Sequence, residues 1–134
     1  MTEPGPTTDD ARRDAGMRTR REVLGDAWVD RAVAGTTPFT ADFQDYITRT
    51  AWGDIWQRPG LARRDRSLLT LAITIALRHW DEFELHVRAA KNNGLSDEEI
   101  AEVIQHAAVY AGVPAANHAF KLARAVLEEL RGRS

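Results

Sequence analysis

Apolar residues recur along this chain at the spacing of one buried helix face, and this pattern predicts an all-α protein. Positions i, i+3, i+4 and i+7 lie on one side of an α-helix, and no segment shows a convincing strand pattern. We expect helices over residues 8–24, 26–34, about 40–52, 63–77, about 80–93, 97–111 and 114–131. These six or seven helices are expected to form one domain over residues 11–132, after a polar, flexible tail over residues 1–10.

Local signals support several of these helix ends. Ser96 and Glu99 have the spacing of a capping box, in which each side chain binds the backbone N–H of the other residue. Gly94 suits the end of the preceding helix because glycine accepts left-handed backbone angles. Residues 53–61 are predicted to form a loop, since Pro59-Gly60 is a strong turn signal.

The helix predicted over residues 63–77 is apolar on nearly every side in its second half. A helix of this kind is normally buried on every side. A chain of 134 residues has few other helices with which to cover it. We therefore expect another subunit to complete the core, with these apolar positions: Leu68, Leu69, Leu71, Ala72, Ile73, Ile75, Ala76 and Leu77.

The next helix carries the chemistry of greatest interest. Glu82 and His86 are four residues apart, so both side chains lie on one face of the helix. A helical wheel places them toward the apolar side, with Phe83 and Val87, and away from the solvated charged side. A buried acid and imidazole acquire shifted pKa values, which is the usual setting for acid–base chemistry. The alternative is a structural ion pair or hydrogen bond at a subunit seam.

Other residues near this helix are candidates for substrate binding. Arg78 and Arg66 lie on or beside the preceding helix, and an arginine there suits a substrate carboxylate because its guanidinium binds both oxygens. Exposed salt bridges are the simpler interpretation of either one. His118 and His79 are further candidates. The histidines and Glu82 lack the spacing of the common zinc and di-iron motifs, so no metal is expected.

Composition narrows the classes of function. The net charge is −2 with no long basic block, so phosphate-driven binding of nucleic acid is not expected. The chain has no cysteine, which excludes disulfides, thiolate metal sites and thiol redox catalysis. No apolar run approaches the ~18 residues of a membrane span, and the N-terminus lacks the apolar core of a signal peptide. A cytoplasmic protein that does not contact membranes is expected.

Taken together, these residues resemble the carboxymuconolactone decarboxylase family. Within it they are most similar to the γ-carboxymuconolactone decarboxylases of the protocatechuate branch of aromatic catabolism. The similarity runs from about residue 16 to residue 127. It rests on the segments RREVLGD (20–26), WGDIWQRPGL (52–61), RSLLTLA (66–72), EFELHVRAA (82–90), NNG (92–94) and AVYAGVPAANHAF (108–120).

The resemblance implies a helical subunit, a ring-like homo-oligomer that is commonly a hexamer, and a lactone dicarboxylate substrate. Decarboxylation would give β-ketoadipate enol-lactone. The lactone itself accepts the electrons, so no cofactor is expected. His86 would donate the proton, Glu82 would orient it, and Arg78 or Arg66 would hold the carboxylate that does not react.

Two other functions are compatible with the sequence, and one residue departs from the family pattern. The same pair of residues suits a cofactor-free decarboxylase or isomerase acting on another lactone or β-keto acid. A non-catalytic oligomer that binds an aromatic acid is the alternative from a different class. Trp28 stands where the resembling decarboxylases often have a histidine after Gly-Asp-Ala, so this position bears on substrate fit.

Overall fold

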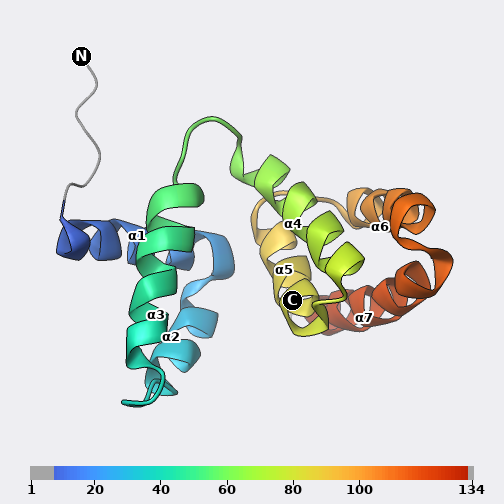
Figure 1. Ribbon diagram of the computed structural model, residues 1–134. Coiled ribbons are helices and arrows are strands. Elements are labelled where there is room, and N and C mark those ends of the chain that lie inside the picture. Colours follow the sequence, from blue (N-terminus) through green and yellow to red (C-terminus); the bar gives the residue numbers. More distant parts are fainter. Residues whose placement is uncertain (1–7, 133–134) are drawn as a thin grey trace. The chain divides into compact units, whose positions relative to one another are not determined.

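The computed structural model describes residues 8–132, and every regular element within that range is a helix (Figure 1). The described residues form two compact units: unit 1, which ends at Leu61, and unit 2, which begins at Ala62. The described parts hold seven α-helices and one π-helix, which confirms the all-α prediction. None of the described helices is long and apolar enough to cross a bilayer. Most of the predicted tail lies outside the described residues, although Asp9 and Asp10 already belong to the first helix.

The first unit contains α1 (Asp9–Leu24), α2 (Asp26–Ala34), α3 (Ala41–Ile47) and the π-helix η1 (Thr48–Ile55). Two glycines allow α1 and η1 to touch backbone to backbone. A Cβ added at Gly16 would lie 2.9 Å from the backbone nitrogen of Gly53. A Cβ added at Gly53 would lie 2.7 Å from the carbonyl oxygen of Arg12. Side chains therefore cannot separate these two helices where they cross.

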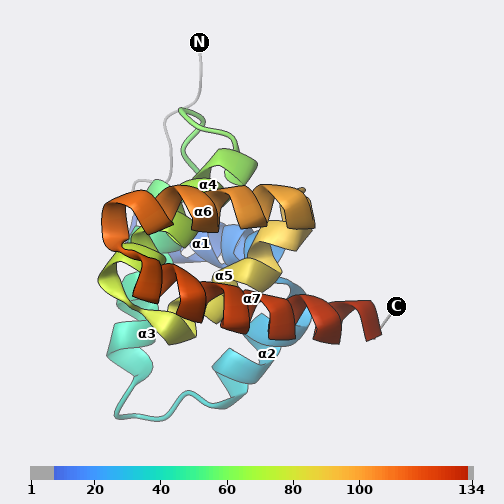
Figure 2. The same ribbon diagram turned by 90° about the vertical axis from the view of Figure 1, so that its right-hand side faces the viewer.

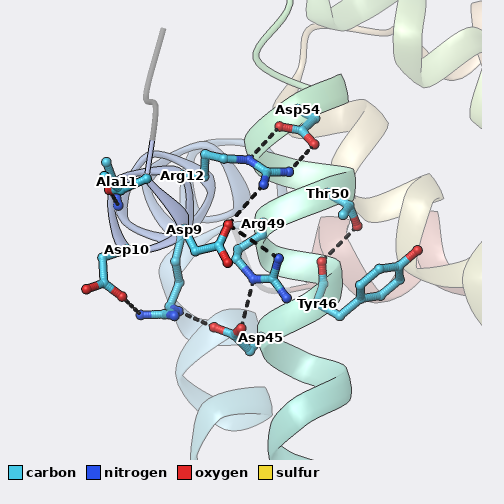
Figure 3. Close-up of polar contacts among 11 residues, drawn as sticks. Asp9, Asp10, Ala11, Arg12, Asp45, Tyr46, Arg49, Thr50 and Asp54 are labelled. Carbon is cyan, nitrogen blue, oxygen red and sulfur yellow. Dashed lines mark hydrogen bonds and ion pairs between the residues drawn. The ribbon is translucent and has the colours of Figure 1, made fainter.

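A network of ion pairs surrounds this crossing (Figure 3). Arg12 pairs with Asp9 and, at 2.5 Å, with Asp54 of η1. Asp45 accepts hydrogen bonds from Arg49 of the same continuous helix, at 2.8 Å, and from Arg13 of α1. These two guanidinium groups, Arg49 first, lower the pKa of Asp45. Because the network is solvated, its ion pairs add little to stability.

The π-helix corrects the predicted loop. Residues 53–55 were expected to lie in a loop, but the helix continues through them to Ile55 with wider turns. The backbone N–H of Trp56 binds the carbonyl of Ala51, five residues earlier, at 2.9 Å. The rings of Trp52 and Trp56 stack with centroids 5.3 Å apart. Gly53, where the predicted loop begins, is here the contact point for α1.

The second unit contains α4 (Arg63–Leu77), α5 (Trp80–Asn92), α6 (Asp97–Ala111) and α7 (Val113–Gly132). Figure 2 shows α6 and α7 lying side by side. Gly112 alone separates them in the chain. One hydrophobic core is shared by all four helices, and its larger residues include Leu71, Ile75, Phe83, Val87, Ile100, Ile104 and Val126. The boundaries of α4 agree with the prediction because the apolar period and the adjoining turn residues coincide there.

The predicted helix caps between α5 and α6 are confirmed. The backbone N–H of Glu99 donates to Ser96 Oγ at 3.1 Å, and the N–H of Ser96 donates to Glu99 Oε1 at 3.0 Å. Gly94 has φ of +97°, directly after the last residue of the α5 cap. A side-chain hydrogen bond joins the start of α4 to the end of α5, because Asn93 Nδ2 donates to the buried Ser67 Oγ at 2.9 Å.

The expected burial of α4 on every side is not found in the single chain. Leu71 and Ile75 face the core, but Leu69, Ile73 and Leu77 remain 50%, 55% and 58% exposed. Their four-residue spacing makes one apolar stripe along α4. Beside it, a groove of about 570 Å³ lies between α4 and α6. The other large exposed apolar side chains of unit 2 are Val109, Tyr110, Val113 and Phe120.

The glycine crossing gives a testable stability prediction. Gly16→Ala should lower the free energy of unfolding by about 1–3 kcal/mol, because the new methyl group meets backbone that cannot move independently. Helix propensity alone predicts the opposite sign, since alanine is the better helix former. Gly60→Ala is the control, because a Cβ there meets nothing within 4 Å, and a change within about 0.5 kcal/mol is expected. Equal effects of the two substitutions in urea unfolding would contradict the close crossing.

Candidate active site

The position of His86 follows from the packing of α5. Phe83, Val87 and Ala90 occupy successive turns and are fully buried in the core of unit 2. His86 and Ala89 border that face, and both are buried as well, with His86 only 5% exposed. The imidazole therefore borders the apolar face of α5 and is buried with it.

The side chain of Glu82 is more exposed than the sequence predicts. Its carboxylate Oε2 lies 3.8 Å from His86 Nε2, so the two side chains do share one face. However, the side chain of Glu82 is 61% exposed, and the expectation that it is buried is wrong for the single chain. It lies in the first turn of α5, at the edge of the apolar face. A separation of 3.8 Å exceeds hydrogen-bond length, so Glu82 does not fix the tautomer of His86 by a hydrogen bond in the free chain.

Burial sets the protonation state of His86. Loss of solvation disfavours the charged imidazolium and lowers the pKa of His86 from 6.5 to about 4. The exposed Glu82 carboxylate does not counteract this because water screens it. At neutral pH the His86 ring is thus uncharged, which leaves it able to accept or donate one proton at each step of a reaction.

Arg78 and His79 form the turn between α4 and α5. Arg78 has φ of +57° and ψ of +37°, the left-handed conformation, and its N–H binds the carbonyls of Ile75 and Thr74. The helix is broken here, so the i,i+4 pair of Arg78 with Glu82 that a continuous helix would allow is not formed. Both Arg78 and His79 are exposed.

Arg66 lies at the other end of α4. Twelve residues of helix separate it from Arg78, about 18 Å along the axis. The hydrogen bond between Ser67 and Asn93 shows that the start of α4 is level with the end of α5. Arg78 is accordingly level with the first turn of α5, near Glu82. Within unit 2, the two arginines that were predicted to bind substrate lie at opposite ends of the α4–α5 hairpin. Arg78 is at the end where Glu82 lies.

His118 contacts the same end of the hairpin. Its ring meets Trp80, the first residue of α5, edge to face with centroids 4.6 Å apart. Trp80 also contacts Phe83 edge to face at 6.0 Å. A role for Trp80 in positioning His118 was not predicted, because tryptophan at a helix start reads as ordinary core packing. The structure therefore groups Arg78, His79 and Glu82 with the pair of Trp80 and His118 at one end of unit 2.

The groove between α4 and α6 is a different kind of site. It is lined mainly by apolar side chains such as Leu68 and Val103, and its polar rim includes Glu102 and His106. Glu99, also on this rim, is paired with Arg64. An acidic rim disfavours a substrate with two carboxylates, so the groove suits an apolar partner better.

The position of Trp28 and the expected absence of a metal can also be compared with the structure. Trp28 of α2 is partly buried in unit 1, with the guanidinium of Arg31 5.6 Å from its ring centroid. Within residues 8–132, no group of three or more His, Cys, Asp or Glu side chains is arranged to hold a metal ion. The absence of a metal therefore stays a prediction about the reaction.

Comparison with known proteins identifies relatives. The Carboxymuconolactone decarboxylase family matches residues 41–125, which include the whole α4–α5 hairpin. The 4-carboxymuconolactone decarboxylase of Acinetobacter baylyi is 44% identical over 122 residues, 91% of each chain. The nitrosuccinic acid decarboxylase npaB of Metarhizium robertsii is 43% identical over 127 residues, 92% of this chain and 89% of that protein. A 4-carboxymuconolactone decarboxylase of Pseudomonas putida is 56% identical over 43 residues, 32% of this chain and 90% of that sequence.

The buried His86 predicts how stability depends on pH. The unfolded chain takes up a proton near pH 6.5, whereas the folded chain does so only near pH 4. Stability should therefore fall as the pH drops through this window, by roughly 3 kcal/mol from this group alone. Urea unfolding between pH 4 and 7 measures the slope. His86→Gln should remove this contribution, and His106→Gln, at an exposed position, should keep it. Parallel pH curves for all three proteins would contradict the buried neutral imidazole.

Proposed function

This chain belongs to the carboxymuconolactone decarboxylase family, and we propose that it is a carboxy-lyase that converts 4-carboxymuconolactone to β-ketoadipate enol-lactone and CO₂. The observation that carries the proposal is 44% identity over 91% of both chains with a protein of that name. The reaction belongs to protocatechuate catabolism by the β-ketoadipate pathway, and we place it in the cytoplasm.

The proposed reaction needs an acid but no external electron acceptor. The bond from the ring carbon to its carboxylate breaks, and its electron pair moves through the C=C bond onto the lactone carbonyl as CO₂ leaves. The resulting dienolate takes one proton at the carbon next to that carbonyl. The substrate dianion and one proton thus become the product monoanion and CO₂. Because the lactone is the electron acceptor, neither a metal nor an organic cofactor is required.

We assign the proton to His86. In the free chain this imidazole is neutral, because burial lowers its pKa to about 4. A bound dianion reverses that balance, since negative charges close to a buried imidazole favour its protonated form. His86 then takes up a proton together with the substrate and delivers it to the dienolate. Glu82, 3.8 Å away, adds a further negative charge that stabilises the imidazolium once the bound substrate displaces the water that screens it.

A cation must also hold the carboxylate that survives. Arg78, His79 and His118 lie at the same end of unit 2 as Glu82 and stay our candidates for this contact. Arg66, at the far end of α4, also stays a predicted substrate contact, but it cannot share one carboxylate with Arg78 within unit 2.

A second substrate is favoured by a specific relative. The nitrosuccinic acid decarboxylase is 43% identical over 92% of this chain, almost the same similarity as the lactone enzyme. Nitrosuccinate also carries its labile carboxylate on a carbon bonded to an electron-accepting group, here nitro in place of the unsaturated lactone. In both molecules that carbon bears a CH₂–COO⁻ group that the reaction leaves intact. Decarboxylation of nitrosuccinate is our second candidate activity.

We also propose that the chain works as a homo-oligomer, with a hexamer favoured by the resemblance. The apolar stripe Leu69, Ile73 and Leu77, half exposed in the single chain, supports association. So do the more exposed Val109 and Tyr110 of α6, since contiguous apolar surface of this kind usually marks an interface.

Turnover separates these enzymatic proposals from a binding module. Purified protein should release CO₂ from 4-carboxymuconolactone, with or without a chelator, and the assay is repeated with nitrosuccinate. Glu82→Gln and His86→Ala should each lower kcat roughly 10²-fold if they serve proton transfer. His106→Ala is the matched control and should be as active as the parent protein. Saturable binding without CO₂ release from either substrate would exclude the decarboxylase, and full activity of both variants would exclude the assigned roles.

The proposed assembly has its own test. Ile73→Arg places a charge in the middle of the apolar stripe and should shift the mass measured by light scattering toward smaller species. Ala125→Arg adds the same charge at an exposed position of α7 and should leave the mass unchanged. A parent protein that is monomeric at micromolar concentration would contradict the assembly.

A further inference from the structure

We propose that Arg78 anchors the carboxylate that survives the reaction, and that the site therefore accepts 2-substituted succinates as a class. This inference rests on the proposed decarboxylase function and deepens it. It makes one arginine the residue that determines specificity, and it leaves the electron-accepting substituent free to vary. Three independent features of unit 2 support it.

The first feature is the backbone of Arg78. With φ of +57° it is the one residue other than glycine that has positive φ within residues 8–132. Left-handed backbone directly after a helix is where glycine is strongly favoured, because a Cβ is strained there. Arginine has no conformational advantage at this position. Its presence is explained if the side chain itself is needed, and non-glycine residues in this conformation cluster at functional sites.

The second feature is uncompensated charge. The other arginines in the described part of unit 2 have polar partners: Arg64 pairs with Glu99, Arg88 with Glu129, Arg124 with Glu128 and Arg131 with Asp97, while Arg63 and Arg66 also have interactions. Within residues 8–132, Arg78 forms no side-chain hydrogen bond or ion pair, although Asp81 and Glu82 are close in sequence. A guanidinium with five free donors is suited to a ligand carboxylate.

The third feature is its position along the α4–α5 hairpin relative to His86, the proposed proton donor. Arg78 is level with the first turn of α5, and His86 lies one to two helical turns further along, about 6–9 Å. A succinate skeleton has its two carboxylates on adjacent carbons. A carboxylate held by Arg78 therefore leaves the reacting carbon two bonds away, and we place that carbon toward His86. The third substituent on that carbon receives the electron pair and requires no contact with Arg78.

The substrate class follows from this spacing. A 2-substituted succinate loses the carboxylate on the substituted carbon, the electron pair enters the substituent, and His86 returns one proton to the resulting anion. The CH₂–COO⁻ arm stays bound to Arg78 throughout. An analogue that lacks an electron-accepting substituent, such as 2-methylsuccinate, should bind without reacting. An analogue that lacks the arm, such as 2-methylbutyrate, should bind at least tenfold more weakly.

The decisive variant is Arg78→Gly, because glycine suits the left-handed backbone. The variant should fold as well as the parent protein or better, with an unfolding midpoint that is unchanged or raised. It should nevertheless bind 2-methylsuccinate at least tenfold more weakly by calorimetry. For any substrate that turns over, kcat/KM should fall 10–100-fold, mainly through KM. Arg78→Lys, which keeps the charge but not the forked donor, should fall in between. Arg124→Ala, at a side chain that is 81% exposed, removes the same charge and should change neither property.

Binding and turnover separate the two levels of the proposal. If the parent protein binds 2-methylsuccinate, Arg78→Gly does not, and no substrate turns over, the anchor stands and the decarboxylase function fails. If the lactone turns over equally in the parent protein and in Arg78→Gly, the function stands and the anchor is overturned. The anchor is also overturned if the parent protein binds 2-methylsuccinate no better than 2-methylbutyrate.

Discussion

The packing of α5 into the core of unit 2 is the constraint on which the candidate site depends. Phe83 and Val87 are fully buried and secure one face of the helix, and His86, which borders that face, is only 5% exposed. The cost of desolvation falls on the imidazolium rather than on the neutral ring. The ring therefore stays uncharged, and its pKa is lowered to about 4. Helix packing thus sets the protonation state of the group that the proposed chemistry uses.

This arrangement links substrate binding to protonation. A decarboxylation that releases CO₂ into solution consumes one proton, and a histidine that is neutral in the free protein is a poor acid until it takes up a second ring proton. A substrate with two carboxylates provides the missing electrostatic stabilisation when it binds. Glu82, exposed and 3.8 Å from the ring, and Arg78, without a carboxylate partner in the described chain, lie at the same end of the hairpin. Arg78 attracts a bound dianion and Glu82 repels it, and the two forces together favour one orientation of the substrate.

Most of the fold was predictable from the sequence, because apolar period and turn residues agree. The observed bounds of α2 and α4 match their predictions, and the capping box at Ser96 forms as its residues indicate. The π-helix was not predictable, since an apolar spacing of about four residues fits wide and normal turns alike. The sequence also predicted the face on which Glu82 lies but not how exposed its side chain is. A helical wheel gives the direction of a side chain, whereas its exposure depends on where neighbouring helices end. Arg66 and Arg78 were equivalent in sequence and are separated only by the length of α4.

The protonation state of His86 can be read directly by ¹⁵N NMR of histidine-labelled protein at pH 6, with the His86 signals assigned by comparison with His86→Gln. Spectra are recorded without ligand and with saturating 2-methylsuccinate. The account predicts a neutral His86 ring in the free protein and a protonated ring in the complex. A ring that is already protonated without ligand would contradict the effect of burial. A ring that stays neutral in the complex would contradict proton uptake on binding.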